Sequence, residues 1–264
     1  MHKIFNIVIY ILAGFGLLMI IGYLAVQLGL TNTKGIVDTQ HDYFKNQIKM
    51  DASWSNTEEW KILKEAIKKD TDVINKVSIE TGVSSRKIVA ILVVEQMRLF
   101  TSEREIYKKI FAPLKILGNQ SQFSWGVMGI KQETARQIEM NLKNNKSPWY
   151  LGKESENILD FSTDKTDQER FERLTNEVDR YYSYLYASIL IKQLEKQWED
   201  AGFPIENNIG VSATLYNIGF VNSLPKANPE IGGAKIEINK TMYSFGGFAQ
   251  SFYNSDELTD EFKR

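Results

Sequence analysis

A run of seven apolar residues followed by a carboxylate constrains the fold of this chain more than any other feature. Residues 88–94, within the stretch SRKIVAILVVEQMRLF (residues 85–100), are all apolar, and Glu95 follows them directly. Placed on a helix, these side chains cover nearly the whole circumference of its first turns. A helix of this kind belongs inside a core made by other elements. We therefore expect a mainly α domain built around this segment.

Glu95 is the first candidate functional residue, because it marks the point where the buried segment meets something polar. A desolvated carboxyl resists ionisation, so we expect its pKa to be raised. A carboxylic acid that keeps its proton near neutral pH is suited to general-acid catalysis. The alternative is a structural glutamate, either at an exposed helix end or paired with Arg86 or Arg98.

The composition restricts the chemistry that is open to the chain. There is no cysteine, and the two histidines are His2, at the N-terminus, and His41, in a polar segment. Disulfides, thiolate zinc sites and cysteine nucleophiles are thereby excluded, and neither a histidine metal site nor a Ser-His-Asp triad is expected. The net charge is −1 at pH 7 and no basic stripe occurs, so we expect no nucleic-acid partner.

The N-terminal segment is uncharged from residue 4 to residue 30. At about 1.5 Å per residue, a helix of this length spans a hydrocarbon core of about 30 Å. We expect an uncleaved membrane anchor at residues 1–33 and a linker at 34–53. The alternative is a cleaved signal peptide, although residues 25–27 (AVQ) match a cleavage site poorly. Lys3, the only cationic side chain before the span, favours a cytoplasmic N-terminus and an exported domain.

The remaining residues, 54–264, show helical patterns separated by short breaks. Helices are predicted at residues 56–69, 71–81, 85–100, 102–110, 132–142, 166–198 and 207–215. On the second of these, Val73, Val77 and Ile79 are expected to face inward. Alternation over residues 234–245 predicts a β-hairpin that turns at Asn239. A last helix is expected to follow Gly246-Gly247, before a frayed tail.

Three short motifs then stand in order along the chain. They are Val94-Glu95-Gln96, the segment SWGVMG at 124–129 with Thr134-Ala135 after it, and LYNIG at 215–219. In this order and at these separations they resemble the lytic transglycosylases of the lysozyme-like superfamily, relatives of goose-type lysozyme. That family has Glu-Ser, then Gly-Leu-Met-Gln leading to Thr-Ala, then Ala-Tyr-Asn-Ala-Gly. The resemblance covers about residues 70–220 and implies a lysozyme-like helical domain.

The resemblance implies a role for each matching residue. Glu95 takes the position of the catalytic acid/base, and the tyrosine hydroxyl of the third motif is implied to lie near it. The implied substrate-binding residues are Gln96, Ser124, Gly126, Met128, Tyr216 and Asn217. Gln96 replaces a serine, and Gly129 replaces the glutamine of the second motif, which removes one expected polar contact. Leu215 and Ile218 replace alanines, so a weakened or substrate-shifted enzyme is also open.

The implied activity is cleavage of the β-1,4 bond between N-acetylmuramic acid and N-acetylglucosamine in peptidoglycan. Glu95 would protonate the glycosidic oxygen and then take the proton of the muramic acid 6-hydroxyl, which leaves a 1,6-anhydro product without metal or cofactor. The expected partners are glycan strands and, through the anchor, the bacterial cytoplasmic membrane, with the domain on its outer side. Two alternatives stay open: a hydrolytic goose-type lysozyme with Glu103 or Glu105 as second acid, and a non-catalytic peptidoglycan-binding module of an envelope assembly.

Overall fold

The computed structural model describes residues 52–101 and 124–264, together with residues 10, 14, 16, 17, 19 and 20. The chain divides into two units, Met1–Asp42 and Tyr43–Arg264. The division falls within the segment predicted as a linker, residues 34–53.

In the N-terminal unit, the described residues are all helical. Four of them expose large side chains: Tyr10, Leu17, Met19 and Ile20. Within the described part of the chain, no helix is both long enough and apolar enough to cross a membrane. Most of the predicted span, the predicted helix at 102–110 and the two alternative acids Glu103 and Glu105 lie outside the described residues.

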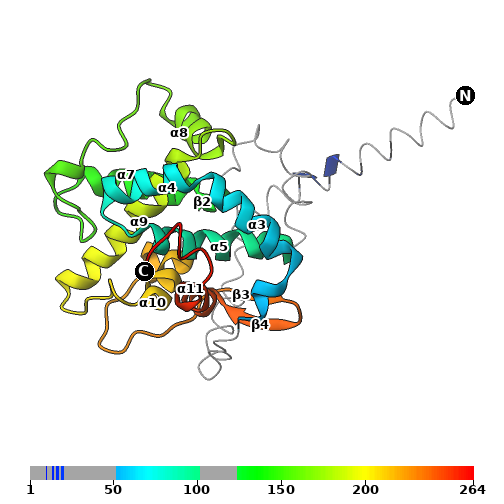
Figure 1. Ribbon diagram of the computed structural model, residues 1–264. Coiled ribbons are helices and arrows are strands. Elements are labelled where there is room, and N and C mark those ends of the chain that lie inside the picture. The colour runs from blue at the N-terminus through cyan, green and yellow to red at the C-terminus, as the bar shows by residue number, and fades with distance from the viewer. Residues whose placement is uncertain (1–9, 11–13, 15, 18, 21–51, 102–123) are drawn as a thin grey trace, which may run out of the picture. The chain divides into compact units, whose positions relative to one another are not determined.

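The second unit is mainly helical, as predicted, and carries two small antiparallel sheets in its described part (Figure 1). The eight α-helices described there are α3 (Glu58–Lys69), α4 (Thr71–Thr81), α5 (Ser85–Thr101), α7 (Gln132–Lys143), α8 (Thr166–Thr175), α9 (Tyr181–Asp200), α10 (Ile209–Ile218) and α11 (Phe245–Asn254). Short 3-10 turns are η1 (Ser53–Asn56), η4 (Lys153–Ser155) and η5 (Phe220–Asn222). Strands β1 (Ser124–Trp125) and β2 (Ile130–Lys131) form one sheet, and β3 (Lys235–Ile238) and β4 (Thr241–Ser244) form the other.

Helix α5 is the centre of this unit, as its sequence predicts. The Ser84 hydroxyl caps it by accepting a hydrogen bond from the Lys87 backbone N–H at 3.3 Å. Every residue from 88 to 95 is buried. In Figure 1, α5 runs through the middle of the unit, with α3 and α4 to one side and α10 and α11 to the other. Burial of each large aliphatic side chain of α5 stabilises the fold by about 1.5–3 kcal/mol.

The helices before α5 agree with the predictions except in two details. Helix α3 begins at Glu58, after a cap by Thr57, because residues 53–56 form the turn η1 that buries Trp54. Ile79 does not face inward: its side chain is 85% exposed. Ile74 is buried in its place, three residues before the buried Val77. Gly82 ends α4 with a left-handed φ of 73°, as predicted.

The long pattern at 166–198 is two helices rather than one. The break lies at residues 176–180, between α8 and α9. The Asn176 side-chain oxygen accepts hydrogen bonds from the N–H groups of Val178 and Asp179, and the Asp179 carboxylate accepts one from Tyr181 N–H. These local bonds satisfy backbone donors outside a helix, which is how Asn and Asp compete with helical structure.

The predicted hairpin is confirmed, with Lys235 opposite Ser244 and Ile238 opposite Thr241. Its turn has left-handed backbone at Asn239 (φ 49°) and at the next residue (φ 63°), the geometry of a two-residue type I′ turn. Strand β3 packs against α5 and thereby covers one side of the central helix.

The C-terminal predictions need two corrections. Gly246 and Gly247 lie inside α11, whose N-cap is the Ser244 hydroxyl, rather than before it. A side chain on Gly246 would collide with Thr214 and with the backbone of α10, so this glycine allows the two helices to pack closely.

The tail is also not frayed. Leu258 and Phe262 are buried. The guanidinium of Arg86, itself fully buried, donates to carbonyl oxygens within residues 252–262, those of Phe252, Tyr253, Ser255, Glu257 and Phe262. The end of the chain is therefore held by the burial of Leu258 and Phe262 and by the hydrogen bonds from Arg86 to its carbonyl groups.

Candidate functional site

The three motifs that are separate in the sequence meet in space. The Gln96 side-chain amide donates to the Val127 carbonyl oxygen at 2.5 Å, which joins α5 to the β1–β2 turn. The Tyr216 hydroxyl donates to the Met128 carbonyl oxygen at 2.6 Å, which joins α10 to the same turn. The same β1–β2 turn lies against the carboxyl group of Glu95.

Glu95 is both buried and paired. Its side chain is 6% exposed, and its Oε2 atom lies 2.5 Å from a terminal nitrogen of Arg98, one helical turn later. The Arg98 side chain is 16% exposed, and its guanidinium lies 6.0 Å from the centre of the Phe245 ring. Burial favours the protonated acid and the guanidinium favours the carboxylate, so the two effects oppose each other.

Glycines shape the turn that faces this carboxyl. Gly126 and Gly129 both have a φ of 65°, a left-handed conformation that side chains rarely adopt. A Cβ atom on Gly126 would collide with the Leu174 carbonyl oxygen, and one on Gly129 would lie 2.7 Å from Oε2 of Glu95. Glycine at position 129 thus leaves room for the Glu95 carboxyl group, because any side chain there would occupy the same space.

Tyr216 lies close enough to the carboxyl to feel its charge, while its hydroxyl bonds to Met128. Burial, and next the charge of Glu95, raise the pKa of the Tyr216 hydroxyl well above its ordinary value, against a smaller opposing effect of Arg98. The hydroxyl therefore keeps its proton and serves as the donor to Met128. Its ring stacks on Phe245 at a centroid distance of 6.4 Å, so Phe245 contacts both Tyr216 and Arg98.

The amide side chain of Asn217 also holds the framework of the site. Its Oδ1 atom accepts a hydrogen bond from the Ala234 backbone N–H at 2.8 Å, which ties α10 to the segment that leads into β3. Gly233 allows this approach, because a Cβ atom there would lie 2.9 Å from the same oxygen. Ser124 pairs with Lys131 across β1 and β2.

The structure therefore brings Glu95, Gln96 and Tyr216 together around the turn that contains Met128. The contacts of Ser124 and Asn217 described above are with other segments. Around the buried Glu95, residues Gln96 and Leu99 of α5 are half-exposed, and so are Val127 and Gly129 of the β1–β2 turn. At the end of α10, Asn217, Ile218 and Gly219 are half-exposed as well.

Sequence reasoning missed two contributors. Phe245 comes from the C-terminal helix, and nothing in the motifs or their spacing indicates that it lies beside Arg98 and Tyr216. Ser183 lies on α9, and its hydroxyl accepts a hydrogen bond from the Met128 backbone N–H at 3.4 Å. Helical periodicity predicts a helix over this position but does not indicate that Ser183 contacts Met128.

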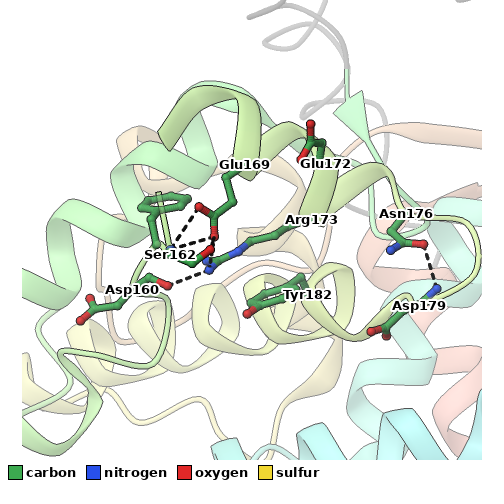
Figure 2. Close-up of a pocket in the computed structure, with 9 residues that line it drawn as sticks. Asp160, Ser162, Glu169, Glu172, Arg173, Asn176, Asp179 and Tyr182 are labelled. Carbon is green, nitrogen blue, oxygen red and sulfur yellow. Dashed lines mark hydrogen bonds and ion pairs between the residues drawn. The ribbon is translucent and has the colours of Figure 1, made fainter. Parts of the chain in front are cut away.

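A second candidate is a pocket of about 550 Å³ beside α8 and α9 (Figure 2). It is lined by Asp160, Phe161, Ser162, Glu169, Glu172, Arg173, Asn176, Asp179 and Tyr182. The Glu169 carboxylate accepts hydrogen bonds from the backbone N–H and hydroxyl of Ser162 and of Thr163. These bonds, the backbone N–H of Ser162 first, lower the pKa of Glu169 to about 2.

Arg173 also binds other groups of the protein in and around this pocket. It pairs with Glu169 at 2.6 Å, donates to the carbonyl oxygens of Leu159 and Asp160, and lies 4.3 Å from the centre of the Tyr182 ring. Figure 2 shows these groups directed at one another rather than outward. The polar groups of this pocket therefore stabilise the loop before α8. Among the described residues, no cluster of His, Cys, Asp or Glu is arranged to hold a metal ion.

Comparisons with models of known protein families, with curated proteins and with solved structures found no match to this chain. A functional assignment therefore depends on the motifs and on the geometry around Glu95.

Proposed function

We propose that the chain is a lytic transglycosylase of lysozyme-like fold that cleaves peptidoglycan between N-acetylmuramic acid and N-acetylglucosamine. One observation carries the proposal: a buried carboxyl group, Glu95, lies where three sequence motifs that resemble those of the family meet, although Glu95 and Tyr216 are 121 positions apart in the chain. Convergence of the motifs on the one acidic residue among them, the residue that the resemblance makes catalytic, supports the proposal.

The proposed reaction uses Glu95 as the single acid/base. Protonated Glu95 gives its proton to the glycosidic oxygen, and the bond from that oxygen to C1 of the muramic acid breaks. The 6-hydroxyl oxygen of the same sugar bonds to C1 and gives its proton to the Glu95 carboxylate. The product is a 1,6-anhydro sugar, the enzyme regains its starting state, and no water, metal or cofactor is consumed.

The neighbouring groups are proposed to position this carboxyl. Tyr216 holds the Met128 carbonyl, and Gln96 holds the Val127 carbonyl, so the turn stays against Glu95. The Gly129 backbone then limits the orientations that the carboxyl can take. Fixing a reacting group in one orientation is a large part of enzymatic rate enhancement.

The N-terminal segment is proposed to anchor the domain to the outer side of a bacterial cytoplasmic membrane. The support is the uncharged stretch at 4–30 and the exposed apolar side chains of its described helical residues, such as Leu17 and Ile20. Full-length protein is then expected to resist salt extraction and to be released by detergent at full mass. A mature N-terminus near residue 30 would instead support the cleaved signal peptide.

The experiment that tests the activity is product analysis after incubation with purified murein sacculi. A transglycosylase releases muropeptides with 1,6-anhydro ends, which are lighter by one water than the reducing ends left by hydrolysis. Anhydro products support the proposal, and reducing ends support a hydrolytic lysozyme. Binding to sacculi without any soluble product would support the binding module.

A further inference from the structure

Arg98 has no counterpart in the motifs that support the proposed function, yet its guanidinium lies directly against the Glu95 carboxyl. The two side chains are 2.5 Å apart and are 16% and 6% exposed. An ion pair this close and this sheltered from water is screened far less than a surface pair. The guanidinium also lies over the Phe245 ring, 6.0 Å from its centre.

The other charged groups around this end of α5 are few in the described part of the chain. Tyr216 on α10 faces the carboxyl and is neutral, because its pKa is raised by burial and by Glu95. Helix α11 contributes Phe245 and no charged residue. Strand β3, which packs on α5, carries Lys235 and Glu237, and Lys131 follows the turn that contains Gly129.

We propose that Arg98 is a positioning residue that sets the charge state of Glu95, so that the site is ionised at rest and cleavage is favoured by acid. This inference rests on the proposed function and concerns the regulation of the same site. The guanidinium has two consequences for an acid/base carboxyl. It reduces the fraction of Glu95 that carries a proton near neutral pH, and it stabilises the carboxylate that forms when the proton is given away.

These consequences predict a pH signature that a purely structural role would not produce. Cleavage by the full chain should fall as the pH rises through the titration of Glu95, since the acid step needs the proton. In Arg98→Gln this alkaline limb should move up by about 1 pH unit or more, the effect of removing an opposite charge at close range. The rate on the acid plateau should fall several-fold, because a weaker acid donates its proton less readily.

Two further variants keep the test decisive. Arg98→Lys retains a cation and should keep the alkaline limb close to that of the wild type, although it loses the planar guanidinium. Arg98→Met retains the apolar stem beside Phe245 and takes the place of Arg98→Gln if that variant does not fold. The same upward shift of the alkaline limb is expected for it. Arg180→Gln, which removes an arginine paired with Asp70 at 2.9 Å elsewhere, should leave the pH profile unchanged.

A readout without activity separates this inference from the proposed function. The carboxyl of Glu95 can be titrated by ¹³C NMR of glutamate-labelled full chain in detergent, with Glu95→Gln used to assign its signal. The titration midpoint should be higher in Arg98→Gln than in the wild type, and equal midpoints would overturn the inference. If the wild type cleaves no murein at any pH, the proposed function fails, while the midpoints still decide whether Arg98 sets the charge of Glu95.

Discussion

Gly129→Ala tests whether the close approach of the β1–β2 turn to Glu95 matters for the reaction. The added Cβ atom would lie 2.7 Å from Oε2, 2.9 Å from Cδ and 3.3 Å from Oε1 of Glu95. Ordinary contact begins near 3.4 Å, so the carboxyl must retreat by about 0.7 Å or the turn must open. Either response moves the proposed acid/base relative to a bound sugar.

Two separate costs follow from this substitution. The left-handed backbone at position 129 penalises a side chain by about 1–2 kcal/mol, which lowers the free energy of unfolding. Displacement of the carboxyl adds a loss of activity, and misplacing a catalytic group by about 1 Å can cost roughly 10²-fold. Cleavage per folded molecule should therefore fall by about 10²-fold in Gly129→Ala.

Gly202→Ala is the matched control for this variant. Gly202 also has a left-handed φ, of 84°, but a Cβ atom there would meet no atom within 4 Å. The two variants should thus lose similar stability in thermal unfolding, while only Gly129→Ala loses cleavage of murein sacculi. Equal cleavage rates for the two folded variants would refute the argument that the glycine exists to admit the carboxyl.

Three other substitutions test separate parts of the structure. Tyr216→Phe removes the donor to the buried Met128 carbonyl, so it should cost about 1–3 kcal/mol in chemical unfolding and reduce cleavage less than loss of Glu95 does. Glu169→Gln should make the free energy of unfolding less dependent on pH in acid. The pKa of Glu169 is about 2 in the folded chain and about 4.3 in the unfolded chain. The carboxylate therefore stabilises the fold above pH about 4.3, and this contribution is lost as the pH falls toward 2. The stability difference between the wild type and this variant should therefore shrink over that range, and a constant difference would contradict the assignment. Lys240→Gly should raise the melting temperature slightly, because glycine adopts the φ of 63° at the hairpin turn without strain, and a clear decrease would contradict the turn type.

The central helix and the hairpin were predictable because each depends on a pattern carried by neighbouring residues, whereas the meeting of the motifs was implied only by the resemblance. The apolar run before Glu95 indicates a buried element, and the Asn239 turn follows from strand alternation on both sides. Pairing of Glu95 with Arg98 was foreseeable only as one alternative, since their spacing places them on one helix face without fixing the rotamers.

The features that were missed depend on contacts between distant segments. The buried tail was read as frayed because its composition is charged, although Phe262 packs into the core and Arg86 binds the carbonyls around it. The break between α8 and α9 follows from local side-chain bonds at Asn176, which leave helical periodicity on both sides intact. Phe245 reaches the site through the packing of α11 on α10 and α5.

The most direct test of the account is the activity of Glu95→Gln on purified murein sacculi, compared with Glu169→Gln. Both substitutions neutralise a sheltered glutamate that pairs with an arginine one turn later on its own helix, at 2.5 Å in the first case and 2.6 Å in the second. Glu169→Gln also weakens the hydrogen bonds from Ser162 and Thr163, so it controls for lost stability without changing Glu95. The account predicts that release of anhydro-muropeptides falls by about 10²–10⁴-fold or more in Glu95→Gln and stays near the wild-type rate in Glu169→Gln. Near-wild-type release by folded Glu95→Gln would contradict the assignment of Glu95 as the acid/base.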